Sequence, residues 1–178
     1  MTDPDASTHA AALAEADAHA RQRALDVHRS WLVQAPAGSG KTELLVQRVL
    51  ALLAHVDAPE RVVATTFTIK AAEEMRARVM SALRDARDGA AAASPHRAQT
   101  LALAGEVLAQ DRRKQWQLLE FPARLDIGTL DRLALRISSQ LPVSSTMGGF
   151  PAIEENADVL YRTAALRAIE SAAPDDVA

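Results

Sequence analysis

The sequence predicts an α/β fold in which helices flank a parallel sheet. Three observations carry this prediction. The apolar run Trp31-Leu32-Val33 precedes a glycine-bearing loop, a helical pattern of Leu and Val follows that loop, and a second β-branched run comes at Val62-Val63. Because a strand, a helix and a strand joined by short loops form a βαβ unit, we expect the two strands to be parallel with a right-handed connection.

The other elements follow from helix propensity and from the spacing of apolar residues. The domain is expected to begin at residue 13, after a tail (1–12) that is disordered at its start. The predicted elements are helices over 8–26, 42–55, 71–88, 97–110, 112–119, 130–140 and 154–171, and strands over 30–34, 61–66 and 125–128.

The composition is that of an ordinary globular protein. The chain has 178 residues, 48% of them hydrophobic and 24% charged, which suffices for one domain with a substantial core. There is no cysteine and hence no disulfide, and no apolar run approaches the roughly 18–20 residues of a membrane span. The formal net charge of −3 does not by itself indicate nucleic-acid binding, although a channel needs only local positive charge. The simplest interpretation is a cytoplasmic protein without a membrane partner.

The loop after the first predicted strand is typical of a phosphate-binding loop, or P-loop. It reads Ala35-Pro36-Ala37-Gly38-Ser39-Gly40-Lys41-Thr42. Its two glycines let backbone N–H groups turn toward an anion, and the helix that follows adds unpaired N–H groups and the positive end of its dipole. We expect Lys41 to reach the β- and γ-phosphates of a nucleotide and the Thr42 hydroxyl to be a ligand of Mg²⁺. The P-loop NTPase fold and a nucleotide site follow as predictions, with Lys41 and Thr42 as candidate catalytic residues.

The segment after the second predicted strand distinguishes among P-loop proteins. Phe67, Thr68 and Lys70 place an aromatic ring, a hydroxyl and an ammonium group just before a helix begins. At the carboxyl edge of a parallel sheet, where ligands bind, these groups suit a DNA backbone and a stacked base. The structural alternative is that Thr68 only caps the helix while Phe67 packs in the core. The sequence leaves both interpretations open.

Taken together, the motifs resemble the UvrD/Rep type of superfamily 1 DNA helicases. The resemblance rests on G-S-G-K-T followed by T-F-T-x-K-A-A-x-E-M, and the register over 30–45 is similar to the RecB/AddA branch, the helicase subunits of exonuclease V-like enzymes. In that branch an alanine is usual at the position of Ala35. Gln22 lies 19 residues before Lys41 and matches the family's upstream glutamine, which reads adenine.

A third stretch, 127–133, resembles the next DNA-contacting motif of these helicases. The resemblance implies that Thr129 contacts a phosphate and that Asp131 lies at the DNA. Asp131 and Arg132 stand where many relatives carry His and Ser, and Ile69 likewise replaces a usual Asn or Arg. These departures put the details of DNA contact in question.

The resemblance implies an ATP-dependent DNA helicase of a recombination or repair helicase–nuclease, translocating 3′ to 5′ on single-stranded and duplex DNA. ATP and Mg²⁺ would be its cofactors and a second helicase–nuclease subunit its partner. It also implies an incomplete RecA-like domain over 13–133, with a helical insert at about 85–124, and the truncated start of a helical subdomain over 134–178. Because no apolar run ending in Asp-Glu occurs, we expect the N-terminal fragment of a larger enzyme, inactive in isolation.

Two alternatives of other classes stay open. One is a small P-loop kinase or phosphotransferase, which would need a mobile arginine-rich lid; Arg76 and Arg78 are the candidate lid residues. The other is a truncated, non-catalytic fragment that binds nucleotide weakly or does not fold stably.

Overall fold

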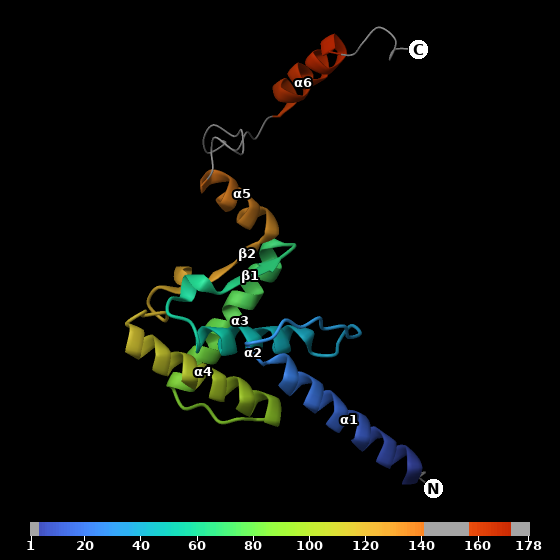
Figure 1. Cartoon of the computed structure of the whole chain (residues 1–178), viewed down its shortest axis with the longest axis vertical. Coiled ribbons are helices and arrows are strands. Elements are labelled where there is room, and N and C mark those ends of the chain that lie inside the picture. Colours follow the sequence, from blue (N-terminus) through green and yellow to red (C-terminus); the bar gives the residue numbers. More distant parts are fainter. Residues whose placement is uncertain (1–3, 141–156, 172–178) are drawn as a thin grey trace. The chain divides into compact units, whose positions relative to one another are not determined.

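The computed structural model describes residues 4–140 and 157–171, with side chains from residue 12 onward. The chain divides into two units, Met1–Leu133 and Ala134–Ala178. The elements in chain order are α1 (Pro4–Ala24), α2 (Lys41–Leu53), η1 (Pro59–Arg61), β1 (Val63–Thr66), α3 (Ile69–Arg87), α4 (Pro95–Lys114), η2 (Pro122–Arg124), β2 (Asp126–Thr129), α5 (Leu130–Gln140) and α6 (Asp158–Ser171) (Figure 1). The result is a helix-rich α/β structure.

The sheet in the described part of the chain consists of β1 and β2, which pair in parallel. Val63 lies opposite Asp126 and Thr66 opposite Thr129, so both strands end at the same edge. Two helices, α3 and α4, lie between these strands in the sequence, as a parallel connection requires. The parallel pairing predicted for this fold class is therefore present, but between other segments than we expected.

The strand predicted over 30–34 does not form, and neither does its βαβ unit with 61–66. The segment is irregular, and the Leu32 side chain is 96% exposed. A strand is stabilised by hydrogen-bonded neighbours, and β1 and β2 use their pairing groups on each other. The segment is instead held by side chains: Trp31 Nε1 donates to the Asp26 carbonyl at 3.2 Å, and Arg48 donates to the Arg29 carbonyl at 2.9 Å.

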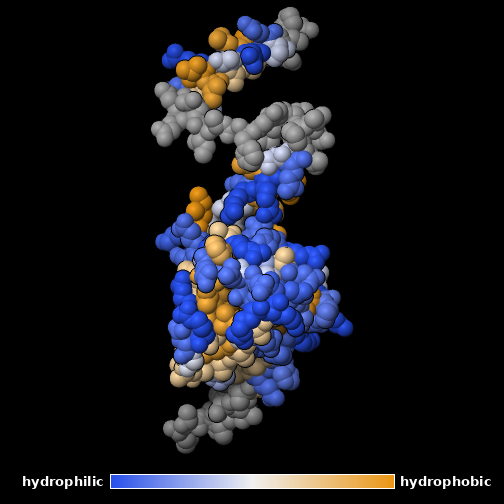
Figure 2. All heavy atoms as spheres, turned by 90° about the vertical axis from the view of Figure 1, so that its left-hand side faces the viewer, coloured by the Kyte–Doolittle hydropathy of each residue, from blue (hydrophilic) through white to orange (hydrophobic). Residues whose placement is uncertain are grey.

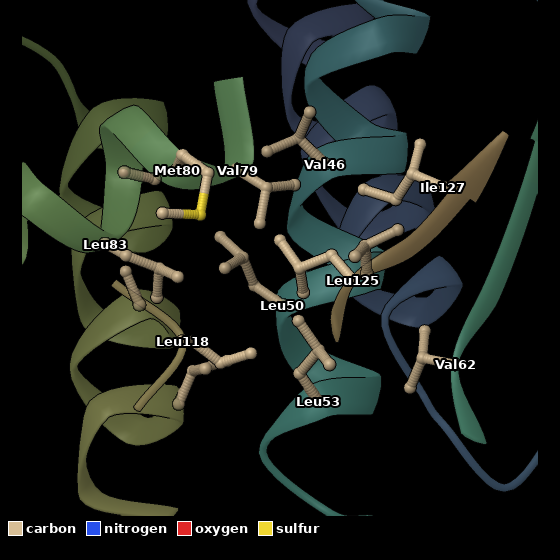
Figure 3. Close-up of a cluster of buried hydrophobic side chains, with 14 of the residues drawn as sticks. Val46, Leu50, Leu53, Val62, Val79, Met80, Leu83, Leu118, Leu125 and Ile127 are labelled. Carbon is tan, nitrogen blue, oxygen red and sulfur yellow. The ribbon is translucent and has the colours of Figure 1, made fainter. Parts of the chain in front are cut away.

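The core of the first unit lies where α2, α3 and α4 meet the strands. Helix α4 packs against both α2 and α3, and α3 also contacts both strands. Figure 3 shows Leu50 and Leu53 of α2 facing Val79 and Leu83 of α3. Further fully or almost fully buried side chains include Val107 of α4 and, beyond it, Leu118, Leu125 and Ile127. Apolar residues at i, i+3 and i+4 account for this packing, because they form one face on each helix.

The predicted insert at about 85–124 contributes one helix rather than two. We expected 97–110 and 112–119, whereas α4 continues without a break to Lys114. The run Asp111-Arg112-Arg113-Lys114 is polar but has good helix propensity, so it extends the helix instead of ending it. The end comes at Gln115, which has a left-handed backbone (φ 55°).

Helix α1 begins at Pro4, inside the segment 1–12 for which we expected a disordered tail. The alanine-rich sequence explains this, because Ala has the highest intrinsic helix propensity. At its other end, α1 contributes the buried Ala24, which joins Leu25 and Leu44 in a small second apolar cluster. This cluster connects α1 to the first turn of α2.

The connections that lead into the two strands are tied together by an ion pair. Arg124 Nε donates to Glu60 Oε1 at 2.6 Å, and its NH1 donates to the Trp116 carbonyl at 2.9 Å. The hydrogen bond from Arg124 lowers the pKa of Glu60 below its usual value. Both partners are partly exposed, so this pair orients the connections more than it stabilises the fold.

The second unit comprises the rest of α5 and α6. No residue of α6 is buried, and its large apolar side chains, such as Tyr161 and Ile169, are exposed. On the face shown in Figure 2, apolar residues of this helix alternate with polar ones. Throughout the described residues, every helix falls short of the length and apolar character that crossing a bilayer requires.

Candidate nucleotide and DNA sites

The loop over 35–42 has the backbone of an anion cradle. Gly38 and Gly40 both have left-handed backbones, with φ of 77° and 78°. Side chains with a Cβ rarely adopt this conformation, so two glycines are required here. Helix α2 begins directly afterwards at Lys41, and Gly40 at its N-cap provides no side-chain hydrogen bond. The first N–H groups of α2 therefore lack both an intrahelical partner and a capping side chain.

Lys41 folds back across this loop. Its Nζ donates to the Ala35 carbonyl at 2.7 Å and also to the carbonyl of Pro36. Both acceptors are neutral, whereas a phosphate would offer charged oxygens and stronger bonds. Inside the loop, the Ser39 hydroxyl oxygen is buried with no hydrogen-bond partner. A buried polar atom without a partner is costly, so this hydroxyl also fits a ligand that completes the site.

A cavity of about 190 Å³ lies beside the loop. Ala35, Ser39 and Lys41 line one side of it, and α1 lines the other with Asp17 and Arg21. Arg21 NH2 donates to the Ser39 carbonyl, and Arg21 Nε donates to Asp17 Oδ2 at 2.7 Å. The sequence did not single out Arg21, and nothing in its local pattern could have done so, because the contact joins residues 18 apart in the chain.

Thr42, the candidate Mg²⁺ ligand, lies exposed in the first turn of α2. Within the described residues there is no group of three or more His, Cys, Asp and Glu side chains that could hold a metal ion unaided. That donor set fits an ion held mainly by nucleotide phosphates and water with one protein hydroxyl, which is how Mg²⁺ is commonly bound in such sites.

Gln22, the candidate adenine reader, lines a different cavity from the P-loop residues. Its neighbours there include His28, His55 and Gln99. The Gln22 carboxamide oxygen accepts a hydrogen bond from Gln99 Nε2 of α4 at 2.7 Å. The structure thus brings Lys41, Ser39 and Ala35 together but does not place Gln22 in their cavity.

The candidate DNA residues gather at the edge where β1 and β2 end, and the paired Thr66 and Thr129 set this geometry. Thr68 Oγ1 accepts from the Ala71 N–H at 3.1 Å and caps α3. Thr129 Oγ1 accepts from the Arg132 N–H at 3.1 Å in the same way at the start of α5. Two capped helix N-termini therefore begin at one edge of the sheet.

The exposure of Phe67 decides between two halves of the structural alternative. Thr68 does cap α3, but the Phe67 side chain is 92% exposed and does not pack in the core. Ile69, Lys70 and Asp131 are exposed beside it. A capping threonine has accepted one hydrogen bond and still has its own O–H to donate, so capping does not exclude contact with a phosphate.

A second cavity, of about 380 Å³, opens at this edge. Gly128, Thr129 and Arg132 line it from β2 and α5, and Ile69 and Glu73 from α3. The Arg132 side chain lies against Gly128, where a methyl group in place of the glycine hydrogen would come within 3.1 Å of Arg132 Cδ. The cavities at the P-loop and at the strand edge have no lining residue in common.

Comparison with known proteins adds a family match to this geometry. The family described as UvrD/REP helicase N-terminal domain matches residues 16–175, which is most of the chain. No solved structure matches the chain.

Several curated proteins are similar to parts of the chain. An ATP-dependent helicase/nuclease subunit (AddA) of Levilactobacillus brevis is 40% identical over 106 residues, covering 60% of this chain and 7% of that protein. A protein of the same name from Desulfitobacterium hafniense is 47% identical over 75 residues, 40% of this chain and 5% of that protein. The ATP-dependent DNA helicase PcrA of Staphylococcus epidermidis is 53% identical over 49 residues, 27% of this chain and 7% of that protein. The matched part of the chain thus spans less than a tenth of each of these relatives.

Proposed function

We propose, from the premise that this chain belongs to the UvrD/REP helicase N-terminal domain family, that it forms the ATP-binding part of an ATP-dependent DNA helicase. The observation that carries the proposal is the P-loop itself. Two left-handed glycines are followed by an uncapped helix N-terminus, and the Lys41 ammonium group lies over the loop. Oriented N–H groups and a cation at one point favour a polyphosphate over other ligands.

In this proposal the P-loop residues Ala35, Pro36, Ala37, Gly38, Ser39 and Gly40 cradle the phosphates through their backbone. Lys41 exchanges its two carbonyl acceptors for β- and γ-phosphate oxygens and neutralises their charge. Thr42 would be the protein ligand of Mg²⁺, whose chemistry is to bridge phosphate oxygens and stabilise the charge that develops in hydrolysis. The P-loop NTPase fold of the complete domain is part of this proposal.

Gln22 would read the adenine base, because a carboxamide can donate and accept at the same time. Its oxygen accepts from Gln99 at 2.7 Å, and its amide hydrogens remain for a base nitrogen. For the base and the triphosphate to be held by Gln22 and Lys41 together, α1 and the P-loop must move relative to each other on binding. This movement is a requirement of the proposal.

We further propose that the strand edge binds DNA. The exposed Phe67 ring would stack on a base, and Thr68, Lys70 and Thr129 would contact backbone phosphates. Asp131 would lie toward the bases, because a carboxylate accepts from base amino groups but repels phosphates. Capping by Thr68 and Thr129 supports this arrangement, since it fixes both hydroxyls at one edge.

The larger activity is also a proposal: 3′-to-5′ translocation by a helicase–nuclease of DNA recombination or repair, in the cytoplasm, together with a second subunit. Relatives named as ATP-dependent helicase/nuclease subunits support it. Because this chain spans only a small part of those relatives, we expect it to bind ATP and DNA rather than to unwind duplexes alone.

Two variants test the assignment of the two sites. Lys41→Ala should lose Mg²⁺-ATP binding in calorimetric titration and keep its affinity for labelled single-stranded DNA. Lys70→Ala should weaken DNA binding and lower its salt dependence by about one phosphate contact, with ATP affinity unchanged. Equal ATP binding by wild type and Lys41→Ala would refute the nucleotide site, and equal DNA binding by wild type and Lys70→Ala would refute the DNA edge.

A further inference from the structure

We infer that Arg21 is a second phosphate-binding cation of the nucleotide site, supplied by α1 and held ready by Asp17. The inference rests on the proposed nucleotide site and adds a residue to it. Neither the P-loop motif nor the upstream glutamine motif includes this position. The structure assigns it through contacts that join α1 to the loop.

The Arg21 guanidinium lies directly on the P-loop. One terminal nitrogen donates to the Ser39 carbonyl, and a methyl group at Gly40 would lie 3.5 Å from both terminal nitrogens. The side chain is only 17% exposed, so the loop covers most of the group. A guanidinium carries five N–H donors, and the hydrogen bonds to Asp17 and Ser39 use two of its three nitrogens. The remaining terminal nitrogen makes no hydrogen bond to any described residue and lines the cavity.

Charge is the second step. The charged residues that line this cavity are three cations, Arg21, Arg23 and Lys41, and one carboxylate, Asp17. Arg21 and Lys41 both bond to neutral loop carbonyls. Two partly buried cations in one cavity repel each other, and an anion between them removes that repulsion. With the buried Ser39 hydroxyl, which has no partner, the ligand class that this arrangement fits is a polyphosphate.

Asp17 orients this cation but is itself largely exposed. Its carboxylate accepts from Arg21 Nε at 2.7 Å, four residues along the helix, while 62% of its own side chain is accessible. It therefore fixes the direction of the guanidinium and leaves the two terminal nitrogens facing the loop. Because Asp17 is also the one acidic group of the cavity, it lowers affinity for an anion through its charge.

The opposite charges of Arg21 and Asp17 provide the test. With the full chain, Mg²⁺-ATP and tripolyphosphate are titrated calorimetrically into wild type, Arg21→Ala, Asp17→Ala and Arg29→Ala. Arg29 is the matched control, an arginine in an i,i+3 ion pair whose side chain is 74% exposed. We expect Arg21→Ala to weaken both ligands about tenfold, the effect of one charge-assisted hydrogen bond. Asp17→Ala should bind both at least as tightly as wild type, and Arg29→Ala should match wild type.

A structural role for Arg21 gives a different pattern. If the Asp17–Arg21 pair only held the loop in shape, both variants would weaken binding together, and that result would overturn the inference. It is also overturned if Arg21→Ala binds tripolyphosphate as tightly as Arg29→Ala. If Arg21→Ala does not fold, the Asp17→Ala titration still decides between the two roles. Failure of wild type to bind ATP better than Lys41→Ala would instead refute the proposed nucleotide site, and this inference with it.

Discussion

Replacing Arg76 tests how the strand edge is built. This half-buried arginine of α3 donates to three backbone carbonyls of the segment leading through β2: Pro122 at 3.1 Å, Leu125 at 2.7 Å, and Ile127. Arg76→Met keeps the apolar stem and removes the donors. Hydrogen bonds from charged groups contribute about 1.5–3 kcal/mol each, and water can reach part of this site, so we expect a loss of roughly 2–4 kcal/mol in the free energy of unfolding.

For a unit of this size, roughly 4 °C of melting temperature corresponds to 1 kcal/mol, so the thermal midpoint should fall by about 8–15 °C. Circular dichroism melts and urea titrations measure both quantities. DNA affinity should fall as well, because Ile127 directly precedes the Gly128-Thr129 end of the strand, while ATP affinity should not change. The same contacts leave Arg76 without the freedom that a mobile kinase lid would need.

Arg78→Met is the matched control, since Arg78 is an exposed arginine two residues along the same helix. It removes the same charge without breaking those three contacts. If the two variants differ by less than about 0.5 kcal/mol, β2 does not depend on Arg76 and the reasoning is refuted.

Three further predictions concern other parts of the first unit. Phe67→Ala should leave the melting temperature unchanged, because the ring is exposed, and should weaken single-stranded DNA binding about tenfold in a polarisation assay. Thr100→Val should cost about 1–3 kcal/mol in urea titration, because it deprives the buried Gln47 amide of an acceptor at 3.0 Å; an unchanged midpoint would contradict this. The Arg124 bond lowers the pKa of folded Glu60, so its contribution is present above the usual Glu pKa and is lost as pH falls through the lowered value. Glu60→Gln should therefore show a smaller loss of stability between about pH 5 and 3 than wild type, and an identical loss would refute the coupling.

Local patterns were sufficient to predict most helices. The ranges 42–55, 71–88 and 130–140 lie within two residues of α2, α3 and α5 at each end, because each has an apolar stripe and a clear stop. The segment 30–34 has equally apolar residues, but a strand exists only with partners, and its partner choice is a long-range property. The sequence could not show that 63–66 would pair with 126–129 instead.

The site divides in the same way. The P-loop chemistry could be predicted from residues that are adjacent in the chain, because glycines, a lysine and a helix start are sufficient to form the cradle. Arg21 and Gln99 were missed, because their contacts with Ser39 and Gln22 span 18 and 77 residues. For Phe67 the sequence allowed either a core or an exposed position, and only the packing of α3 decided it.

The measurement that tests the central claim most directly follows the backbone amides of the P-loop. In a ¹⁵N-labelled sample titrated with Mg²⁺-ATP, the N–H resonances of Gly38, Gly40 and Lys41 should shift in a saturable manner, because these groups would donate to phosphate oxygens. The shifts should be absent in Lys41→Ala at the same ATP concentration. Saturable shifts confined to the cavity around His28 and His55, or P-loop shifts that persist unchanged in Lys41→Ala, would contradict the account.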